Sequence, residues 1–401
     1  MSRQVTAATL SRPVPESDTE LFSAAALLDP YPHYAMLRSL GPAVFLTRYG
    51  MYGLFRHDDV RPALVGWERF SSAEGIAMNP VTNELMAGSI LGMDPPRQRV
   101  VRKVFDDALR PKYVRKVAGD LERLAGDLVD GLVRQREFDG VADFARKLPV
   151  DIVLDLIGFP RDGERADLLE WALGAFDFMG PASAHQSSCR PDVEALMQYL
   201  ATKATPEKLL DGSFGQIVWQ AVDRGEITDT EAVMTMSAYA CAGVDTTIAG
   251  ISSTLWLLAQ HPGEWAQVRA DPETVAGAFL EGLRMEAPVQ SFARVTTCDV
   301  PLEDLTIPAG SRVVLSYGSA GRDERHYPDP DRFRVRRAPS DTVAFGFGVH
   351  HCPGRALATM EAHALFTALA RRVDRIELAG AVRRTPNAIT RGLSALPIRV
   401  T

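Results

Sequence analysis

The sequence is poor in cysteine, and this excludes one broad class of protein. Only four cysteines occur in 401 residues, Cys189, Cys241, Cys298 and Cys352. Cysteines so few and so widely spaced are not the framework of a disulfide-stabilised secreted domain, and they fit a reducing compartment. We therefore expect a cytoplasmic protein that is held together by packing.

The sequence also lacks an excess of basic residues and long apolar runs. Lys and Arg number 44 against 51 Asp and Glu, for a net charge of −7, which argues against a nucleic-acid-binding protein. No apolar run reaches the roughly 18 residues that a membrane span needs. The polar start "MSRQVTAATLSRPVPESDTE" has no apolar region typical of a signal peptide. We expect a mobile tail over residues 1–20, one domain over 21–401, and no membrane partner.

Apolar periodicity indicates a mainly α protein with a small β annex. Helical spacing dominates from residue 96 to about residue 260, and short β-like pieces separated by turn residues follow residue 288. The individual elements that the pattern predicts are two strands in 41–55, a short helix at 57–65, helices at 115–135, 228–262 and 274–288, a last helix that begins after Cys352 and runs to about Val373, and a hairpin over 389–400.

One of the four cysteines stands in an unusual stretch, "AFGFGVHHCPGRALA". Gly346 and Gly348 carry no Cβ, so the backbone there can turn sharply and approach a flat ligand. Pro353 suits the first position of a helix, which places Cys352 near its N-cap, where free N–H groups favour a thiolate. A thiolate beside a surface that the glycines leave free of side chains is suited to be the axial ligand of an iron porphyrin.

Two other interpretations of this stretch are simpler. A lone cysteine is most often a small apolar core residue. Zinc held by His350, His351 and Cys352 is a second alternative. It is disfavoured because adjacent side chains diverge, and we recognise no second Cys/His pair at a metal-binding spacing.

The stretch resembles the cysteine-ligand loop of the cytochrome P-450 heme-thiolate monooxygenases, and the resemblance covers roughly residues 25–400. It implies the family's triangular-prism fold, heme b (iron protoporphyrin IX) as cofactor with Cys352 as its axial ligand, and O2 as co-substrate. The positions that match the family's loop are Phe345, Gly346, Gly348, His350, Cys352, Gly354, Leu357 and Ala358.

"ACAGVDTT" lies midway along the long helix at 228–262. It is similar to the family's acid–alcohol pair, which maps onto Asp245 and Thr246 as catalytic residues. Reductive cleavage of O2 needs two protons, which a carboxylate can relay and a hydroxyl can position. Gly243 would permit a local opening of the helix. The alternative is structural: a Thr hydroxyl bonded to the carbonyl four residues earlier, and Asp245 in an ion pair.

Other motifs match parts of the family that surround the heme. In "MDPPRQRVVRKVF", Gln98 and Arg102 share one helix face, and Arg294 in "SFARVTT" precedes the β annex. With His350, Arg102 and Arg294 would offset the propionate charges through charge-assisted hydrogen bonds. The cofactor-binding residues that the resemblance implies are Gln98, Arg102, Arg294, Phe345, His350 and Gly354.

"EGLR" resembles the family's Glu-x-x-Arg element. Glu281 and Arg284 stand at i, i+3 on one helix face, a spacing that taken alone is common in surface ion pairs. In the family this pair is joined by a further arginine, for which the match here is Arg337. We assign all three a structural role.

The chain carries no flavin or iron–sulfur motif, so its two electrons must come from outside. A ferredoxin or a flavin/iron–sulfur reductase is the partner that the resemblance implies, and we expect a monomer. A basic patch could steer an acidic ferredoxin, or its members could simply be solvated charges on a helix face. Its candidate residues are Arg97, Arg99, Arg102, Lys103, Arg110 and Arg355.

The candidate substrate pocket is rich in phenylalanine, which suggests a small, flat, apolar ligand. Its residues are Ile90, Leu91, Phe176, Phe178, Met179, Ala242, Val289 and Phe292.

Stretches such as "PVQSFARVTTCDV" are similar to a bacterial subgroup that demethylates para-substituted benzoates and anchors the carboxylate with Arg and Ser. This chain departs there: residues 70–96 contain no Lys or Arg, and Ser237, Ala238 and Cys241 occupy the corresponding core-helix positions. A buried carboxylate without a cation is unfavourable. We therefore expect hydroxylation or O-demethylation of a neutral alkoxy- or alkylphenol. A benzoate demethylase and a non-catalytic heme-binding sensor are the alternatives.

Overall fold

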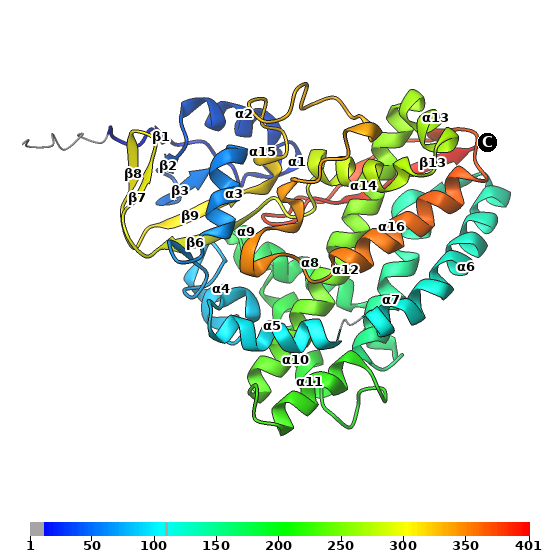
Figure 1. The fold of residues 1–401 in the computed structure, drawn as a ribbon, viewed down its shortest axis with the longest axis horizontal. Coiled ribbons are helices and arrows are strands. Elements are labelled where there is room, and N and C mark those ends of the chain that lie inside the picture. The colour runs from blue at the N-terminus through cyan, green and yellow to red at the C-terminus, as the bar shows by residue number, and fades with distance from the viewer. Residues whose placement is uncertain (1–11, 109–110) are drawn as a thin grey trace, which may run out of the picture.

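The computed structural model describes residues 12–108 and 111–401, and Figure 1 shows them as a triangular outline with the main sheet at one corner and helices over the rest. The helices are α1 (Ala24–Leu28), α2 (Tyr31–Leu40), α3 (His57–Val65), α4 (Pro80–Leu85), α5 (Arg97–Ala108), α6 (Pro111–Gln135), α7 (Lys147–Ile157), α8 (Leu168–Phe178), α9 (Ala184–Ser188), α10 (Arg190–Lys203), α11 (Phe214–Asp223), α12 (Asp229–Gln260), α13 (Pro262–Ala270), α14 (Thr274–Met285), α15 (Tyr317–Ala320) and α16 (Arg355–Ala370). The mainly α architecture is confirmed.

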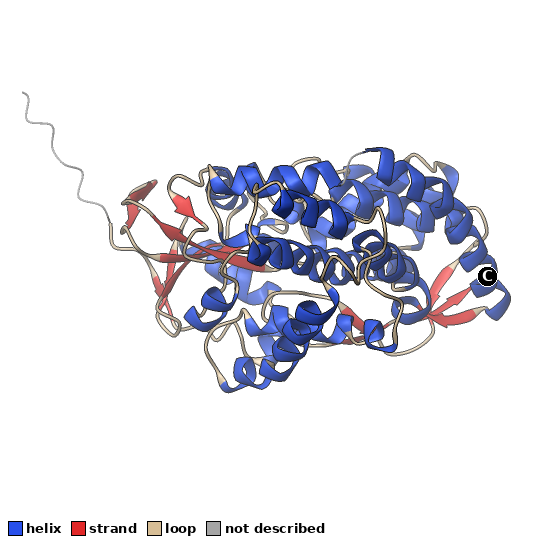
Figure 2. Cartoon of the chain, turned by 90° about the horizontal axis from the view of Figure 1, so that it is seen from below, coloured by secondary structure: helices blue, strands red, loops and turns tan. Residues whose placement is uncertain are grey.

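The strands form one larger sheet and three small ones. Their bounds are β1 (Glu16–Ser17), β2 (Val44–Leu46), β3 (Met51–Leu54), β4 (Phe70–Ser71), β5 (Glu137–Asp139), β6 (Ser291–Thr296), β7 (Val300–Leu302), β8 (Leu305–Ile307), β9 (Arg312–Ser316), β10 (Ile376–Leu378), β11 (Arg383–Arg384), β12 (Leu393–Ala395) and β13 (Pro397–Val400). The six-stranded sheet has the order β1-β2-β3-β9-β6-β4. Figure 2 shows strands gathered at two ends of the molecule, so the small β region of the prediction is confirmed as well.

The hairpin predicted for residues 389–400 is wrong. The chain does form strands there, but β12 pairs with β11, whereas β13 lies between β10 and β5. Leu396 separates the two strands, and the backbone N–H of Gly140 donates to its carbonyl at 2.7 Å. The alternating pattern therefore marked the strands correctly, but it could not identify their partners, two of which precede the segment by ten to twenty residues and one of which, β5, lies far away in the sequence.

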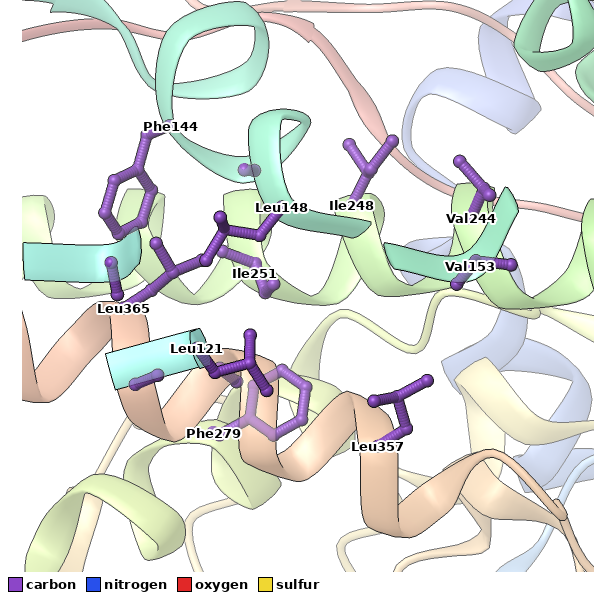
Figure 3. Close-up of a cluster of buried hydrophobic side chains, with 14 of the residues drawn as sticks. Leu121, Phe144, Leu148, Val153, Val244, Ile248, Ile251, Phe279, Leu357 and Leu365 are labelled. Carbon is purple, nitrogen blue, oxygen red and sulfur yellow. The ribbon is translucent and has the colours of Figure 1, made fainter. Parts of the chain in front are cut away.

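The long helix α12 organises the core. Its start is fixed by a capping box in which the Thr228 hydroxyl accepts from the N–H of Glu231 and the Glu231 side chain accepts from the N–H of Thr228. Figure 3 shows Val244, Ile248 and Ile251 of this helix among the side chains of neighbouring helices. Burial of this kind explains why nearly the whole helix is apolar.

In the described part of the chain, α12 is the one helix long and apolar enough to cross a membrane by length and composition alone. However, 72% of its most apolar window is buried inside the protein. Core packing therefore accounts for the apolar composition.

The expected N-terminal tail, residues 1–20, falls partly outside the described residues. In the part that the structure describes, β1 pairs in parallel with β2, and the N–H of Arg12 donates to the carbonyl of Asp304 at 2.7 Å. These contacts attach the segment to the edge of the main sheet.

Candidate functional site

The cysteine loop is shaped by two glycines in the left-handed region. Gly346 has φ 63° and Gly348 has φ 68°. A Cβ on Gly348 would lie 2.9 Å from the carbonyl oxygen of Leu64, so only glycine lets the loop pack against α3. The N–H of Cys352 donates to the carbonyl of Phe345 at 2.9 Å, which closes the loop.

The helix that follows the cysteine starts later than expected. α16 begins at Arg355 with Gly354 as its N-cap, so Cys352 precedes the helix rather than capping it. The N–H groups of Gly354 and Arg355 still point at the sulfur and lower the pKa of the thiol, as does the charge of Arg102. Burial acts in the other direction and is the larger effect, so the pKa of Cys352 lies above its usual range. A coordinated metal ion would supply the positive charge that the protein alone does not.

The thiol lies in the wall of a large cavity between α5, α12, α14, β6 and the cysteine loop. Its empty space, including its opening, is about 1490 Å³, whereas a typical ligand pocket holds about 300–1,000 Å³. The structure brings most of the predicted site residues to this cavity: Ile90, Leu91, Gln98, Arg102, Phe176, Ala242, Thr246, Val289, Phe292, Arg294, Phe345, His350, Cys352 and Gly354.

One corner of the cavity is positively charged. Arg294 is buried and His350 is half-buried, and the Nε2 atom of His350 has no hydrogen-bond partner in the structure. Burial and then the charge of Arg294 lower the pKa of His350 to about 4, although the Asp94 carboxylate acts in the opposite direction. The unpartnered Nε2 of His350 and the nearby guanidinium of Arg294 leave room at this corner for an anionic group. This corner therefore fits the carboxylates of a porphyrin, and the cavity as a whole fits heme, with a sulfur ligand in an otherwise apolar wall.

Gln98 and Arg102 also hold the cysteine loop in place. Gln98 Nε2 donates to the carbonyl of Val349 at 2.7 Å, and Arg102 donates to the carbonyl of His351 at 2.6 Å. Arg102 forms a further ion pair with Asp106 at 2.9 Å. Each side chain therefore links α5 to the loop while facing the cavity.

The acid–alcohol pair lies in the middle of α12. The Thr246 hydroxyl donates to the carbonyl of Ala242 at 2.6 Å, which is the contact of the structural alternative. The structural alternative also requires an ion pair of Asp245, and Asp245 forms none with any described residue. Asp245 is buried and its Oδ2 atom has no partner. Burial raises the pKa of Asp245 to about 6, and a hydrogen bond with the Thr390 side chain limits the rise.

The expected opening of α12 at Gly243 is not found, because the helix is continuous from Asp229 to Gln260. A Cβ on Gly243 would lie 3.1 Å from the side chain of Val153. The glycine therefore permits the close approach of α7 to α12.

Two residues of the site escaped the sequence analysis. Thr390 comes from the loop before β12 and contacts Asp245 across 145 positions of sequence, so no local pattern could reveal it. Glu361 lies in α16, fully buried, and lines the cavity with both carboxylate oxygens unpartnered. An acid in the apolar stretch "MEAHALF" was the available signal. Burial raises the pKa of Glu361 to about 8.

This raised pKa predicts an unusual pH dependence of stability. The folded protein keeps the Glu361 proton up to about pH 8, whereas the unfolded chain releases it near the ordinary value of 4.5. Between these values the folded state binds more protons, so the free energy of unfolding falls as the pH rises. We expect the stability of Glu361→Gln relative to the wild type to rise by about 3 kcal/mol between pH 5 and pH 8, measured by urea unfolding of the heme-loaded protein.

Glu377→Gln, at an exposed position of β10, is the matched control and should leave the pH dependence unchanged. If Glu361→Gln lost stability between pH 5 and pH 8 as steeply as the wild type, Glu361 would be ionised in the folded protein.

The predicted bracing residues do meet. Arg284 binds Glu281 through two hydrogen bonds of 2.7 and 2.9 Å, and both side chains are fully buried. Arg337 reaches Glu281 Oε1 at 2.9 Å, and Arg284 also donates to the carbonyl of Gly321 at 2.6 Å. A buried carboxylate is thus shared by two guanidinium groups, which joins α14 to the segment before the cysteine loop.

The candidate basic patch is partly neutralised. Arg97 is paired with Glu231, Arg102 with Asp106, and Lys103 with Asp107. Arg99 is exposed, and the guanidinium of Arg355 lies 5.4 Å from the centre of the Phe345 ring. Arg110 lies outside the described residues. The cations that remain on this surface are fewer than the sequence suggests.

Phe178 and Met179, which the sequence predicts to line the substrate pocket, do not line the large cavity. They line a neighbouring pocket of about 680 Å³ between α4, α8, α10 and α12. Phe178 follows Phe176 by two positions on α8, and residues two apart on a helix do not share a face. The two spaces share the side chains of Leu91, Phe176, Ala238 and Ala242, so they adjoin above α12.

Comparisons with known proteins agree with this geometry. Residues 198–378 match the family described as Cytochrome P450. The chain is 36% identical to "Cytochrome p450 CYP199A2" of Rhodopseudomonas palustris, over 97% of this chain and 95% of that protein. It is 32% identical to "Putative cytochrome P450 123" of Mycobacterium tuberculosis, over 93% and 94% of the two chains. The crystal structure of CalO2 superposes with a TM-score of 0.81 at 26% identity, over 96% of this chain and 98% of the other.

Proposed function

Because the chain belongs to the cytochrome P450 family and is therefore a heme-thiolate monooxygenase, we propose that it hydroxylates or O-demethylates a small, neutral aromatic substrate. Bound heme supplies the activation of O2, and the protein supplies ligation, orientation, exclusion of water and protons. The observation that carries the choice of substrate is the lining of the pocket above α12, which contains no charged residue among those described.

We assign the residues around the heme as follows. Cys352 supplies the axial sulfur. Arg294, Arg102 and His350 hold the propionates, supported by the unpartnered Nε2 of His350 in their midst. Gln98 supports the cysteine loop beside them. Phe345 and Gly354 line the cavity and would contact the bound ring.

Asp245 and Thr246 deliver protons on the opposite side. A carboxyl group with a pKa of about 6 can both accept and donate a proton near neutral pH. Thr246 faces the cavity, and its oxygen can still accept a hydrogen bond while its hydrogen is bound to the carbonyl of Ala242. A proton from Asp245 therefore reaches the cavity beside Thr246.

The substrate pocket is suited to a neutral molecule with one polar end. Its wall is made of Phe, Leu, Met and Ala side chains, with Ser237 and Cys241 one turn apart on α12. Burial raises the pKa of the Cys241 thiol to about 12, so this side chain stays uncharged. Hydroxyl and thiol groups can bind a phenol, whereas a carboxylate there would lack a cation.

Two electrons per turnover come from a separate ferredoxin or a flavin/iron–sulfur reductase. We propose that residues 21–401 act as one domain and as a monomer, with the substrate entering through the pocket between α8, α10 and α12.

Two alternatives remain distinguishable. A demethylase of para-substituted benzoates is favoured by the sequence likeness noted above, and it requires a cation that the described pocket walls lack. A non-catalytic heme sensor would need no proton relay, and the buried Asp245 beside the cavity argues against it.

A matched set of ligands tests the proposal. We expect 4-alkylphenols to shift the ferric Soret band with dissociation constants at least about tenfold below those of the 4-alkylbenzoates, a difference of about 1.4 kcal/mol. Ala238→Arg would place a guanidinium in the pocket wall and should reverse the preference, because it pairs the benzoate carboxylate. Equal or tighter binding of benzoates by the wild type would overturn the neutral-substrate proposal. Ala238→Leu is the control for size and should not favour benzoates.

A further inference from the structure

Outside the heme cavity, three side chains of different chemistry converge near the end of α8. Asp177 belongs to the last turn of α8, His185 to α9, and Cys189 to the junction of α9 with α10. One potential ligand atom from each lies within 4.8 Å of the others. His185 Nε2 is 2.8 Å from Asp177 Oδ2.

We propose that Asp177, His185 and Cys189 form a binding site for a zinc-type divalent cation. One carboxylate oxygen, one imidazole nitrogen and one thiolate are ligands that Zn²⁺ accepts, with water in the fourth position. In a tetrahedral site with Zn–ligand bonds of about 2.0–2.3 Å, neighbouring ligand atoms lie about 3.4 Å apart. The widest of these separations would need to shrink by about 1.4 Å or less, and the His185–Asp177 contact of 2.8 Å would need to open slightly. Rotation of the exposed His185 side chain can supply such shifts.

The orientation of these residues supports a metal site. His185 and Cys189 stand at i, i+4 on one short helical segment, so both face the same side. This His-x3-Cys spacing corrects the expectation that no second Cys/His pair stands at a metal-binding spacing. The second oxygen of Asp177 accepts a hydrogen bond from the N–H of Ala388 at 2.8 Å. This bond holds the carboxylate in position, as hydrogen bonds from surrounding residues do for metal ligands in general.

The surroundings favour a cation. Asp177 and Cys189 are buried, whereas His185 is half exposed and leaves an entry path. Burial and the neighbouring Asp177 and Asp192 carboxylates raise the pKa of the Cys189 thiol to about 11. The negative field that disfavours the thiolate would attract a divalent ion, which in turn stabilises the thiolate. The guanidinium of Arg190 lies over the Phe178 ring at 5.5 Å rather than in the cluster.

A second cluster provides a useful contrast. His57, His326 and Asp341 also lie within 4.8 Å of one another. There, however, both ring nitrogens of each histidine already contact oxygens of Asp58 or Asp341 at 2.6–3.2 Å. At the α8–α10 cluster, the Cys189 sulfur makes a long contact of 3.5 Å to the carbonyl of His185.

An ion at this site would connect elements that form the substrate pocket. Phe176 and Phe178, on either side of Asp177, line the pocket, and so do Val193 and Met197 of α10. The bond to Cys189 would join the end of α8 to the start of α10. The ion would therefore stabilise the outer wall of the pocket without touching the heme cavity.

Calorimetric titration of the chelator-treated, heme-loaded, tag-free protein with ZnCl2 tests the proposal. We expect one zinc per chain, a higher midpoint of thermal unfolding, and a zinc–sulfur distance of about 2.3 Å in zinc X-ray absorption. Cys189→Ser and His185→Ala should each weaken zinc binding at least tenfold, and Cys189→Ser should remove the sulfur signal. The heme spectrum of each variant verifies folding.

Cys298→Ser and His363→Ala are the matched controls, because both residues are exposed and far from the cluster in sequence. They should bind zinc as the wild type does. Titration without saturable binding, a bound zinc without a sulfur neighbour, or unchanged affinity in Cys189→Ser would each overturn the proposal. None of these outcomes bears on the monooxygenase function, which is read from the heme.

Discussion

Replacing Cys352 by alanine is expected to abolish turnover and to remove the thiolate signature from the spectrum of the reduced carbon monoxide complex. Cys352 would supply bound heme with a sulfur ligand that favours activation of O2, and no other described side chain in the cavity wall can supply sulfur. The cavity corner with Arg294 and His350 remains, so some heme can still bind. The measurements are the heme content, the position of the Soret band under carbon monoxide, and the rate of product formation.

Cys298→Ser is the control for the loss of a thiol, since Cys298 is exposed. It should keep the heme content, the spectrum and the activity. If Cys352→Ala kept the thiolate spectrum, the axial ligand would have to be another cysteine and the proposed site would be wrong. If the wild-type protein held no heme after growth with sufficient iron, the assignment of the cavity would fail.

Local sequence patterns were sufficient to predict those features that a few neighbouring residues determine. The cysteine loop could be identified because Gly346, Gly348 and Cys352 lie within seven residues, and their φ angles and close contacts follow from the missing Cβ atoms. The boundaries of α12 follow from Thr228 and Pro262, which cap and stop it. Such features need no knowledge of distant parts of the chain.

Features that depend on long-range packing could not be predicted. The partner strands of β12 and β13 lie elsewhere in the fold, which is why a hairpin was expected in their place. Thr390 meets Asp245 only after the C-terminal loop has folded back over α12. The raised pKa of Glu361 results from complete burial, which a one-dimensional pattern does not report.

Asp245→Asn is expected to reduce turnover about 100-fold, within the range that general acid–base catalysis provides, and to leave substrate binding within a factor of two. The asparagine keeps the size of the side chain but cannot release a proton. Asp245 does not line the cavity, so its loss should not alter the affinity measured by the Soret shift. A variant that retains more than a third of the wild-type rate would contradict the relay role of Asp245.

The pH dependence separates a relay from a structural role. Burial raises the pKa of Asp245 from 3.8 to about 6, so the wild-type rate should change between pH 5 and pH 7, and Asp245→Asn should lose this step. The folded state binds the proton more tightly than the unfolded chain, so the free energy of unfolding falls as the pH rises from 3.8 to about 6. Asp245→Asn should therefore be no less stable than the wild type at pH 8.

The variant Thr390→Val provides a further test of the relay role of Asp245. The hydrogen bond from Thr390 favours the ionised carboxylate, so its removal should raise the pKa of Asp245 and move the step in the rate to higher pH. Thr254→Val, which removes a hydroxyl elsewhere on the same helix that bonds only the carbonyl of Gly250, should leave the step in place. If Asp245 had only a structural role, the turnover rates of Asp245→Asn, Thr390→Val and Thr254→Val would follow their stabilities. The pH at which the rate changes would then be the same in Thr390→Val as in the wild type.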